Sequence, residues 1–188
     1  MKASSKEELQ KAYDEWHSAS GEVKEVKKQD LKHYLTMLNL LNPEPGKKLL
    51  DVGCGKGVFL FLASKMGLQT YGIDISKVAV DIARRVSHTS EIRVGLGEEL
   101  PWDDNSFDYV TCLGSLEHFL DPAKGVKEMA RVLKPDGRAL ILVPNSFFIG
   151  HIYIWLGDTA FLQTLEGKYS LKGSVLGRSG KSLLKETA

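Results

Sequence analysis

Short runs of apolar residues alternate with longer amphipathic segments along most of the chain. The apolar runs have the length of buried strands and lie at 48–52, 70–75, 92–95, 109–113 and 139–143. Segments with apolar residues at helical spacing precede and separate them, at 4–18, 25–42, 57–66, 77–87 and 122–133. Continuously apolar strands that alternate with helices are typical of a parallel sheet covered on both faces. The pattern therefore predicts an α/β fold.

Signals at the helix boundaries support this division, but the pattern is less regular near the C-terminus. Ser76 is positioned to cap the helix at 77–87, and Asp121 followed by Pro122 supplies a cap and a first-turn proline for 122–133. The apolar segment 147–156 reads as a helix packed in the core, with a membrane-surface helix as the less favoured alternative. From residue 174 the chain is rich in Gly, Ser and Lys and does not read as two strands. We therefore expect the C-terminal strands of the sheet to be incomplete.

Composition narrows the class of protein. The 188 residues are 43% hydrophobic and 26% charged, which is typical of one globular domain. The formal net charge is +1, which gives no electrostatic signature of nucleic-acid binding. Cys54 and Cys112 are too few for a disulfide framework, neither lies in a metal-type pair, and no apolar stretch reaches the roughly 20 residues of a spanning helix. We expect a cytoplasmic protein with no metal, no nucleic-acid partner and no membrane span.

The segment LLDVGCGKG at 49–57 ends the first predicted strand in a glycine-rich turn. Such a turn lets a ligand approach backbone N–H groups at the start of the next helix. The spacing fails for a phosphate-binding P-loop, and Val58 stands where a dinucleotide fingerprint has its third glycine. Asp51, two residues before Gly53, would repel a pyrophosphate but suits a ligand with a cationic amino group. The alternative is a turn that only packs a helix on a strand.

A second acidic residue, Asp74, ends the second predicted strand within YGIDIS at 71–76. A carboxylate at this edge of a nucleotide-binding sheet can accept hydrogen bonds from both hydroxyls of a ribose. The alternative is that Asp74 only caps the following helix. The glycine-rich turn upstream favours ribose binding.

These motifs resemble the class I S-adenosylmethionine-dependent methyltransferases, particularly the small-molecule branch that includes quinone-biosynthesis enzymes. The resemblance covers 48–145. LLDVGCGKG is similar to the family's first motif and YGIDIS to its acidic motif. GLGEELPW at 95–102 is similar to the family's adenine-contacting loop. The segment from DDNSFD to SLEH at 103–118 is similar to the fourth strand and its exit. The segment from RVLKPDGR to VPN at 131–145 is similar to the turn into the fifth strand.

The resemblance implies a Rossmann-like, doubly wound, mostly parallel sheet with helices on both faces, and S-adenosyl-L-methionine as the cofactor. It implies that Asp51 and the glycine turn surround the methionine part of the cofactor. Asp74 would hold the ribose, and the sulfonium would be lined from the end of the fourth strand. The cofactor-binding residues that it implies are Asp51, Gly53, Cys54, Gly55, Asp74, Ile75, Gly97, Glu98, Leu113 and Gly114.

Methyl transfer requires mainly that the protein align a nucleophile with the methyl group and exclude water. A hydroxyl acceptor also benefits from a general base, and His118, just after the fourth strand, is the candidate catalytic residue; a histidine that only orders its loop is the alternative. Tyr13, Trp16 and His17 share one turn of the first helix, which either folds over the cofactor as a lid or packs on the sheet. The acceptor pocket should lie beyond the carboxyl ends of the fourth and fifth strands.

We therefore predict an N-terminal helical lid at 1–42, a cofactor-binding methyltransferase domain at 43–173 and a tail at 174–188. The partner would be a small-molecule methyl acceptor, and an incomplete sheet edge would favour a homo-oligomer. A cofactor-binding module with little turnover is the alternative function, because Leu96 stands where the family often has an aspartate; Glu98 is the candidate substitute. A nucleic-acid methyltransferase is disfavoured, because LGSL at 113–116 replaces the Asn/Asp-Pro-Pro-aromatic motif of base-flipping members.

Overall fold

A computed structural model of the chain describes residues 5–21, 23, 28–143, 151–156, 159–164, 175–176 and 182–183. Its helices are α1 (Lys6–Ala19), α2 (Lys28–Leu41), α3 (Val58–Lys65), α4 (Lys77–Val86) and α5 (Pro122–Val132), with the short 3-10 helix η1 (Leu116–His118). Its strands are β1 (Lys48–Val52), β2 (Gln69–Asp74), β3 (Glu91–Val94), β4 (Phe107–Leu113), β5 (Leu133–Val143), β6 (His151–Leu156), β7 (Thr159–Thr164), β8 (Val175–Leu176) and β9 (Ser182–Leu183). Every helix and strand predicted before residue 144 is present.

The main sheet has the order β3-β2-β1-β4-β5-β6-β7. Strands β1 to β5 pair in parallel, whereas β6 pairs antiparallel with β5 and β7 antiparallel with β6. The strand order reverses between β1 and β4, and ligands of open α/β sheets bind beyond the carboxyl ends of the strands at such a switch point. The Rossmann-like fold class is confirmed.

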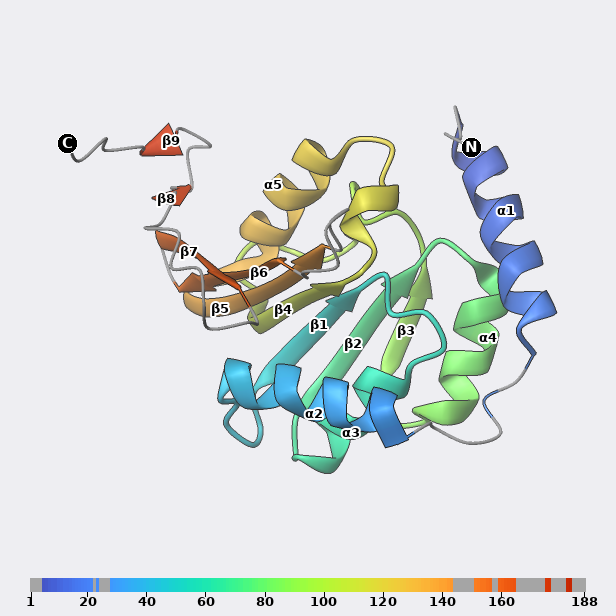
Figure 1. Cartoon of the computed structure of the whole chain (residues 1–188), viewed down its shortest axis with the longest axis horizontal. Coiled ribbons are helices and arrows are strands. Elements are labelled where there is room, and N and C mark those ends of the chain that lie inside the picture. Colours follow the sequence, from blue (N-terminus) through green and yellow to red (C-terminus); the bar gives the residue numbers. More distant parts are fainter. Residues whose placement is uncertain are drawn as a thin grey trace.

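Helices cover both faces of the sheet (Figure 1). On one face, side chains of α2, α3 and α4 pack on the sheet; the fully buried ones are Met37, Leu38, Leu41, Leu60, Ala63, Val80 and Ala83. On the other face, Met129 and Val132 of α5 pack on buried strand residues that include Val110 and Cys112. The predicted caps form: Ser76 accepts a hydrogen bond from Ala79 N, and Asp121 from Lys124 N. Two cores therefore hold the strand ends in fixed positions.

The prediction of a core-packed helix at 147–156 is wrong over its second half. Residues 151–156 form β6, which pairs with β5 in the register Ala139↔Trp155 and Ile141↔Tyr153. Residues 147–150 lie outside the described part of the chain. A short apolar run does not separate strand from helix by periodicity, and the Ile-Tyr-Ile-Trp sequence of β6 has high strand propensity beside the free edge of β5.

Strands β6 and β7 form an antiparallel pair beside β5 that completes the main sheet. This pair lies before residue 174, from which the sequence pattern showed no pair of strands. In the tail at 174–188, β8 and β9 pair antiparallel as a separate two-stranded sheet, so the expectation of no strands there is wrong for these residues. Within the described residues, none of the helices is both long and apolar enough to cross a membrane.

Candidate functional site

The glycine-rich turn links the end of β1 to α3 and is held against β2 by its own backbone. Gly53 N and Cys54 N both donate to the carbonyl of Ile73, at 2.8 and 3.1 Å, and Gly57 N donates to Cys54 O at 3.0 Å. Gly53 and Gly57 have positive φ values of 76° and 77°, a region that favours glycine. The turn therefore has one defined conformation at the switch point of the sheet.

Two of these glycines also permit close approaches to other elements. A Cβ added at Gly53 would lie 2.5 Å from Cβ of Ser115, which follows β4, and one at Gly57 would lie 2.9 Å from Cβ of Ala83 on α4. Ser115 also donates its hydroxyl to Gly53 O at 3.3 Å. The turn is thus packed directly between the exit of β4 and helix α4.

Asp74 joins the glycine-rich turn to the start of α4. Its Oδ2 accepts a hydrogen bond from Gly55 N at 2.8 Å, and its Oδ1 accepts one from Ser76 N at 2.9 Å. The side chain is buried, and burial raises its pKa despite these two hydrogen bonds. Ser76 provides the side-chain cap of α4, so Asp74 is not the cap itself. Each carboxylate oxygen retains capacity for a further donor.

Asp51 lies deeper, near the end of β1. It is buried, and its Oδ1 accepts a hydrogen bond from the Thr111 hydroxyl at 2.7 Å. Burial raises the pKa of Asp51 to about 7, and the negative charge of Asp74 acts in the same direction. A cationic ligand group beside Asp51 would reduce the energetic cost of its buried negative charge.

This environment gives a prediction for Asp51→Asn. Because the folded-state pKa of Asp51 lies above its ordinary value of 3.8, the folded protein binds this proton more tightly than the unfolded chain does. Asp51 therefore costs stability progressively as pH rises from about 4 to about 7, by at most about 4 kcal/mol. We expect Asp51→Asn, which keeps an acceptor for Thr111, to unfold at a higher temperature than wild type at pH 8, with a smaller difference at pH 5, in thermal denaturation. A difference that does not change with pH would contradict the raised pKa.

Helix α1 lies across the start of α4 (Figure 1). Asp14 Oδ1 accepts hydrogen bonds from the Ser76 hydroxyl at 2.5 Å and from Val78 N at 3.1 Å. An anionic side chain is favourable at this position, because the N-terminus of a helix carries unpaired N–H groups and a partial positive charge. Asp14 therefore fixes α1 to the same turn that holds Asp74.

A second contact fixes the end of α1 to the glycine-rich turn. Lys56 Nζ donates to Ser20 Oγ at 2.8 Å and to Gly21 O, at the C-terminal end of α1, where a cation is favoured. One turn of α1 before His17, the Tyr13 ring meets the His118 ring edge-on, with 5.8 Å between the ring centroids. Helix α1 therefore spans from the start of α4 to the exit of β4.

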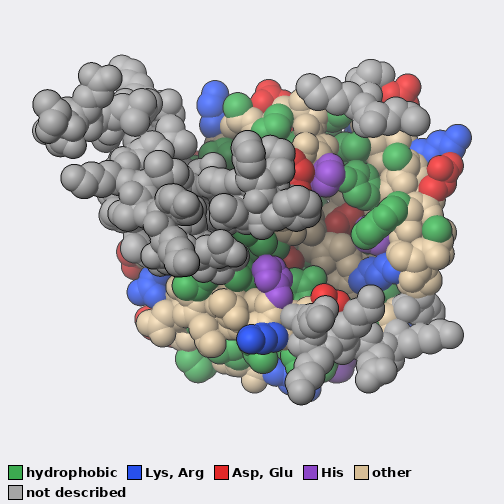
Figure 2. Space-filling view, viewed as in Figure 1, with side chains coloured by type: hydrophobic (Ala, Val, Ile, Leu, Met, Phe, Trp, Pro, Cys, Tyr) green, Lys and Arg blue, Asp and Glu red, His purple; other side chains and the backbone are tan. Residues whose placement is uncertain are grey.

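His118 lies in η1, and its side chain is 54% exposed. Its Nε2 lies 3.7 Å from a carboxylate oxygen of Glu117. The space-filling view shows a hollow on this face, with acidic and histidine side chains around it (Figure 2). His118 is thus accessible at the carboxyl end of β4, on the side where the acceptor is expected.

The other predicted site residues have varied surroundings. The side chain of Cys54 lies in the core against Gly72, so this residue offers only its backbone to the turn. Gly97 is covered by the Phe119 ring, and Glu98 is buried with Oε1 accepting from Leu120 N at 2.8 Å. Ile75, Leu113 and Gly114 are partly exposed at the ends of β2 and β4. Leu113 and Gly114, at the end of β4, lie at the same edge of the sheet as Asp51 and Asp74, at the ends of the neighbouring strands β1 and β2.

Sequence patterns did not reveal several residues of this site. Asp14, Lys56 and Thr111 contribute contacts that join segments far apart in the chain, and burial with the nearby charge of Asp51 raises the pKa of Tyr34 on α2. The only local signal was the charged Tyr-Asp-Glu-Trp context of Asp14. Among the described residues no group of three His, Cys, Asp or Glu side chains is arranged to hold a metal ion.

Comparisons with known proteins bear on this site. Residues 50–141 match the model of the methyltransferase domain family. The ubiquinone biosynthesis O-methyltransferase of Alkalilimnicola ehrlichii is 33% identical over 159 residues, covering 82% of this chain and 64% of that protein. The enzyme of the same name from Coxiella burnetii is 30% identical over 164 residues, covering 81% and 68%. The chain thus spans about two thirds of the length of these curated relatives.

Two solved structures are also similar. The phosphoethanolamine N-methyltransferase 2 of Haemonchus contortus, in complex with phosphomonomethylethanolamine and S-adenosylhomocysteine, is 32% identical with a TM-score of 0.56, covering 60% of this chain and 28% of that one. The [4+2]-cyclase SpnF is 30% identical with a TM-score of 0.56, covering 60% and 44%. The chain belongs to the class I S-adenosylmethionine-dependent methyltransferases, and the sequence resemblance is confirmed.

Proposed function

We propose that this chain binds S-adenosylmethionine at the carboxyl ends of β1, β2 and β4 and catalyses transfer of its methyl group to a hydroxyl of a small-molecule acceptor. The observation that carries the proposal is the pair of buried carboxylates, Asp51 and Asp74, on either side of the glycine-rich turn. The cofactor has a cationic ammonium, a cationic sulfonium and a ribose, which match an acidic, partly desolvated site. The relatives' description as O-methyltransferases supports a hydroxyl acceptor.

Each part of the site has a role in this proposal. Asp51 faces the ammonium group, directly or through water, and Asp74 accepts hydrogen bonds from the ribose while it fixes Gly55. Backbone at 97–98 contacts the adenine edge, Ile75 lies against its face, and the ends of β4 line the sulfonium. Of the 1–42 region, α1 acts as the lid, because the α2 side chains are packed in the core. We also propose a cytoplasmic location, which the free, buried thiols of Cys54 and Cys112 support.

The proposed role of Asp74 predicts a ligand-specific loss of affinity. Asp74→Ala should weaken S-adenosylhomocysteine binding by about 10- to 150-fold, the range for loss of hydrogen bonds to a charged group, without loss of the circular dichroism of the fold. Calorimetry with S-adenosylhomocysteine and its 2′-deoxy analogue separates the ribose contact from support of the turn. The variant should discriminate between the two ligands much less than wild type does. Equal discrimination in both proteins would assign Asp74 to the turn alone.

The methyl transfer itself makes few chemical demands on the chain. When bound, S-adenosylmethionine supplies a methyl group already activated by its sulfonium. The protein aligns the acceptor hydroxyl on the side of the β4 exit and excludes water by the position of α1. His118 accepts the hydroxyl proton as the carbon–oxygen bond forms and the carbon–sulfur bond breaks, and then returns the proton to solvent.

Transfer of labelled methyl from S-adenosylmethionine to a panel of hydroxylated aromatic acceptors tests the activity. Enzyme-dependent incorporation of label into one acceptor class, with formation of an equimolar amount of S-adenosylhomocysteine, would support the proposal. The second candidate function is a cofactor-binding module without methyl transfer, which Leu96 and the similarity to a [4+2]-cyclase favour. Tight S-adenosylhomocysteine binding with no labelled product across the panel would favour that second function.

A further inference from the structure

One buried nitrogen near the glycine-rich turn lacks a hydrogen-bond partner. His17, on α1, is 6% exposed, yet its Nδ1 is buried with no donor or acceptor in the described part of the chain. An unsatisfied buried polar atom costs about 1–3 kcal/mol, so each instance requires an explanation. The other such atom among the described residues, Trp102 Nε1, lies within an aromatic cluster away from the turn.

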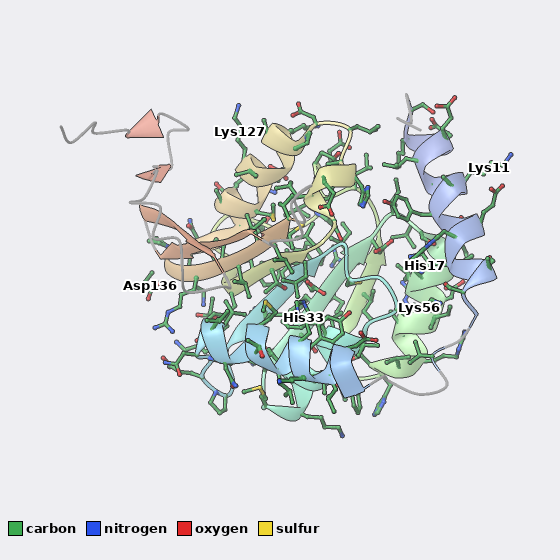
Figure 3. All side chains as sticks on the ribbon, in the orientation of Figure 1. Lys11, His17, His33, Lys56, Lys127 and Asp136 are labelled. Atoms are coloured by element: carbon green, nitrogen blue, oxygen red, sulfur yellow. The ribbon has the colours of Figure 1, made fainter. Side chains whose placement is uncertain are left out.

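The His17 ring lies against the glycine-rich turn. Its Cε1, which lies between Nδ1 and Nε2 in the ring, is 3.9 Å from the position of a Cβ added at Gly55. Gly55 in turn donates its N–H to Asp74, so His17 and Asp74 both lie beside the same residue of the turn. His17 and Lys56 both lie between α1 and the turn (Figure 3).

The position of His17 is fixed by contacts other than its own hydrogen bonds. Asp14 and Lys56 attach α1 to α4 and to the turn, and the Trp16 ring packs edge-on against the imidazole, with 4.6 Å between the ring centroids. Burial lowers the pKa of His17 to about 4, with the charge of Lys56 acting in the same direction, so the ring is neutral near pH 7. A neutral imidazole can donate from Nδ1 while it remains buried.

The turn itself has few free donors for a ligand. The N–H groups of residues 53, 54, 55 and 57 are already bonded to Ile73, Asp74 and Cys54. A polar ligand held against this turn would therefore gain from a donor on the facing helix. The proposed cofactor carries oxygen acceptors both in its amino-acid carboxylate and in its ribose.

We propose that His17 Nδ1 is a cofactor-contacting donor of the lid, which forms a hydrogen bond to an oxygen of S-adenosylmethionine bound on the glycine-rich turn. This inference rests on the proposed function, and it assigns to His17 a binding role rather than the catalytic role of a base. It also explains why a polar ring, rather than an apolar one, occupies this buried position on α1.

Two substitutions separate a ligand contact from packing. His17→Phe keeps a buried aromatic ring but removes the donor, and His17→Asn restores an amide donor near the position of Nδ1. We expect His17→Phe to fold normally by circular dichroism and to bind S-adenosylhomocysteine more weakly, by about 10- to 150-fold for a lost bond to the carboxylate or about 2- to 10-fold for a lost bond to the ribose. His17→Asn should recover most of the affinity. His88→Phe, the same exchange at an exposed histidine after α4, is the matched control and should bind like wild type.

The calorimetry also uses 5′-methylthioadenosine, which has the ribose but lacks the amino-acid part. Loss of affinity for S-adenosylhomocysteine alone supports a contact to the carboxylate, and a parallel loss for both ligands, recovered in His17→Asn, supports a contact to the ribose. Unchanged affinity in His17→Phe, or an equal loss in His17→Phe and His17→Asn, would overturn the inference. Wild-type protein that binds neither ligand would instead overturn the proposed function, and the inference with it.

Discussion

Substitution of Gly53 by valine should abolish measurable binding of S-adenosylhomocysteine. The backbone at Gly53 has a φ of 76°, where a β-branched residue costs about 1–3 kcal/mol. An added Cβ would also overlap Ser115, and overpacking of this kind costs about 1–3 kcal/mol more. The turn must then move away from the exit of β4, which changes the surface proposed to hold the methionine part of the cofactor. Calorimetry measures the binding, and thermal denaturation the accompanying loss of stability.

Two further variants identify which of these effects is responsible. Gly46→Ala is the matched control, because Gly46, in the turn before β1, also has a positive φ, of 81°, but open space around the added Cβ. It should lose some stability and retain most of its affinity. Gly53→Ala combined with Ser115→Gly removes the overlap and should bind better than Gly53→Ala alone. If Gly53→Val binds S-adenosylhomocysteine normally, the turn does not contact the cofactor.

Substitution of His118 should separate catalysis from cofactor binding. If His118 accepts the proton of the acceptor hydroxyl, His118→Ala should lower the turnover number by about 10²–10⁴-fold, the usual contribution of a general base. Affinity for S-adenosylhomocysteine should remain nearly unchanged, since the exposed imidazole lies on the side proposed for the acceptor. Labelled-methyl transfer and calorimetry on the same preparation give the two quantities.

The ring contact between His118 and Tyr13 requires a control, because its loss could also displace α1. His118→Phe keeps an aromatic ring against Tyr13 but cannot accept a proton. It should be as inactive as His118→Ala if the base role is correct. Recovery of activity in His118→Phe would show that the ring only orders the lid, and equal losses of turnover and affinity would assign His118 to the cofactor site.

The features that the sequence predicted well are those determined by local patterns. The alternation of strands and helices, the turn at 49–57, and the caps at Ser76 and Asp121 each depend on a few neighbouring residues. The contacts that attach α1 to the rest of the domain do not depend on neighbouring residues in this way. Asp14 meets Ser76, and Lys56 meets Ser20, across long stretches of chain that no periodicity connects.

The region after β5 illustrates a different limit. The segment 151–156 is apolar enough for either a buried helix or a buried strand, and its choice of strand depends on the free edge that β5 presents. Such an edge exists only once the sheet has formed. The close approach of Ser115 to Gly53 is similar, because the need for glycine at 53 comes from a side chain on another strand.

A pair of parallel titrations tests the central claim most directly. Wild-type protein is titrated by calorimetry with S-adenosylhomocysteine and, separately, with NAD, at pH 7 in the same buffer. The buried carboxylate of Asp51, which would repel a pyrophosphate, and the presence of Val58 in place of a third glycine predict binding of S-adenosylhomocysteine and no measurable binding of NAD. NAD binding tighter than S-adenosylhomocysteine binding would contradict the account.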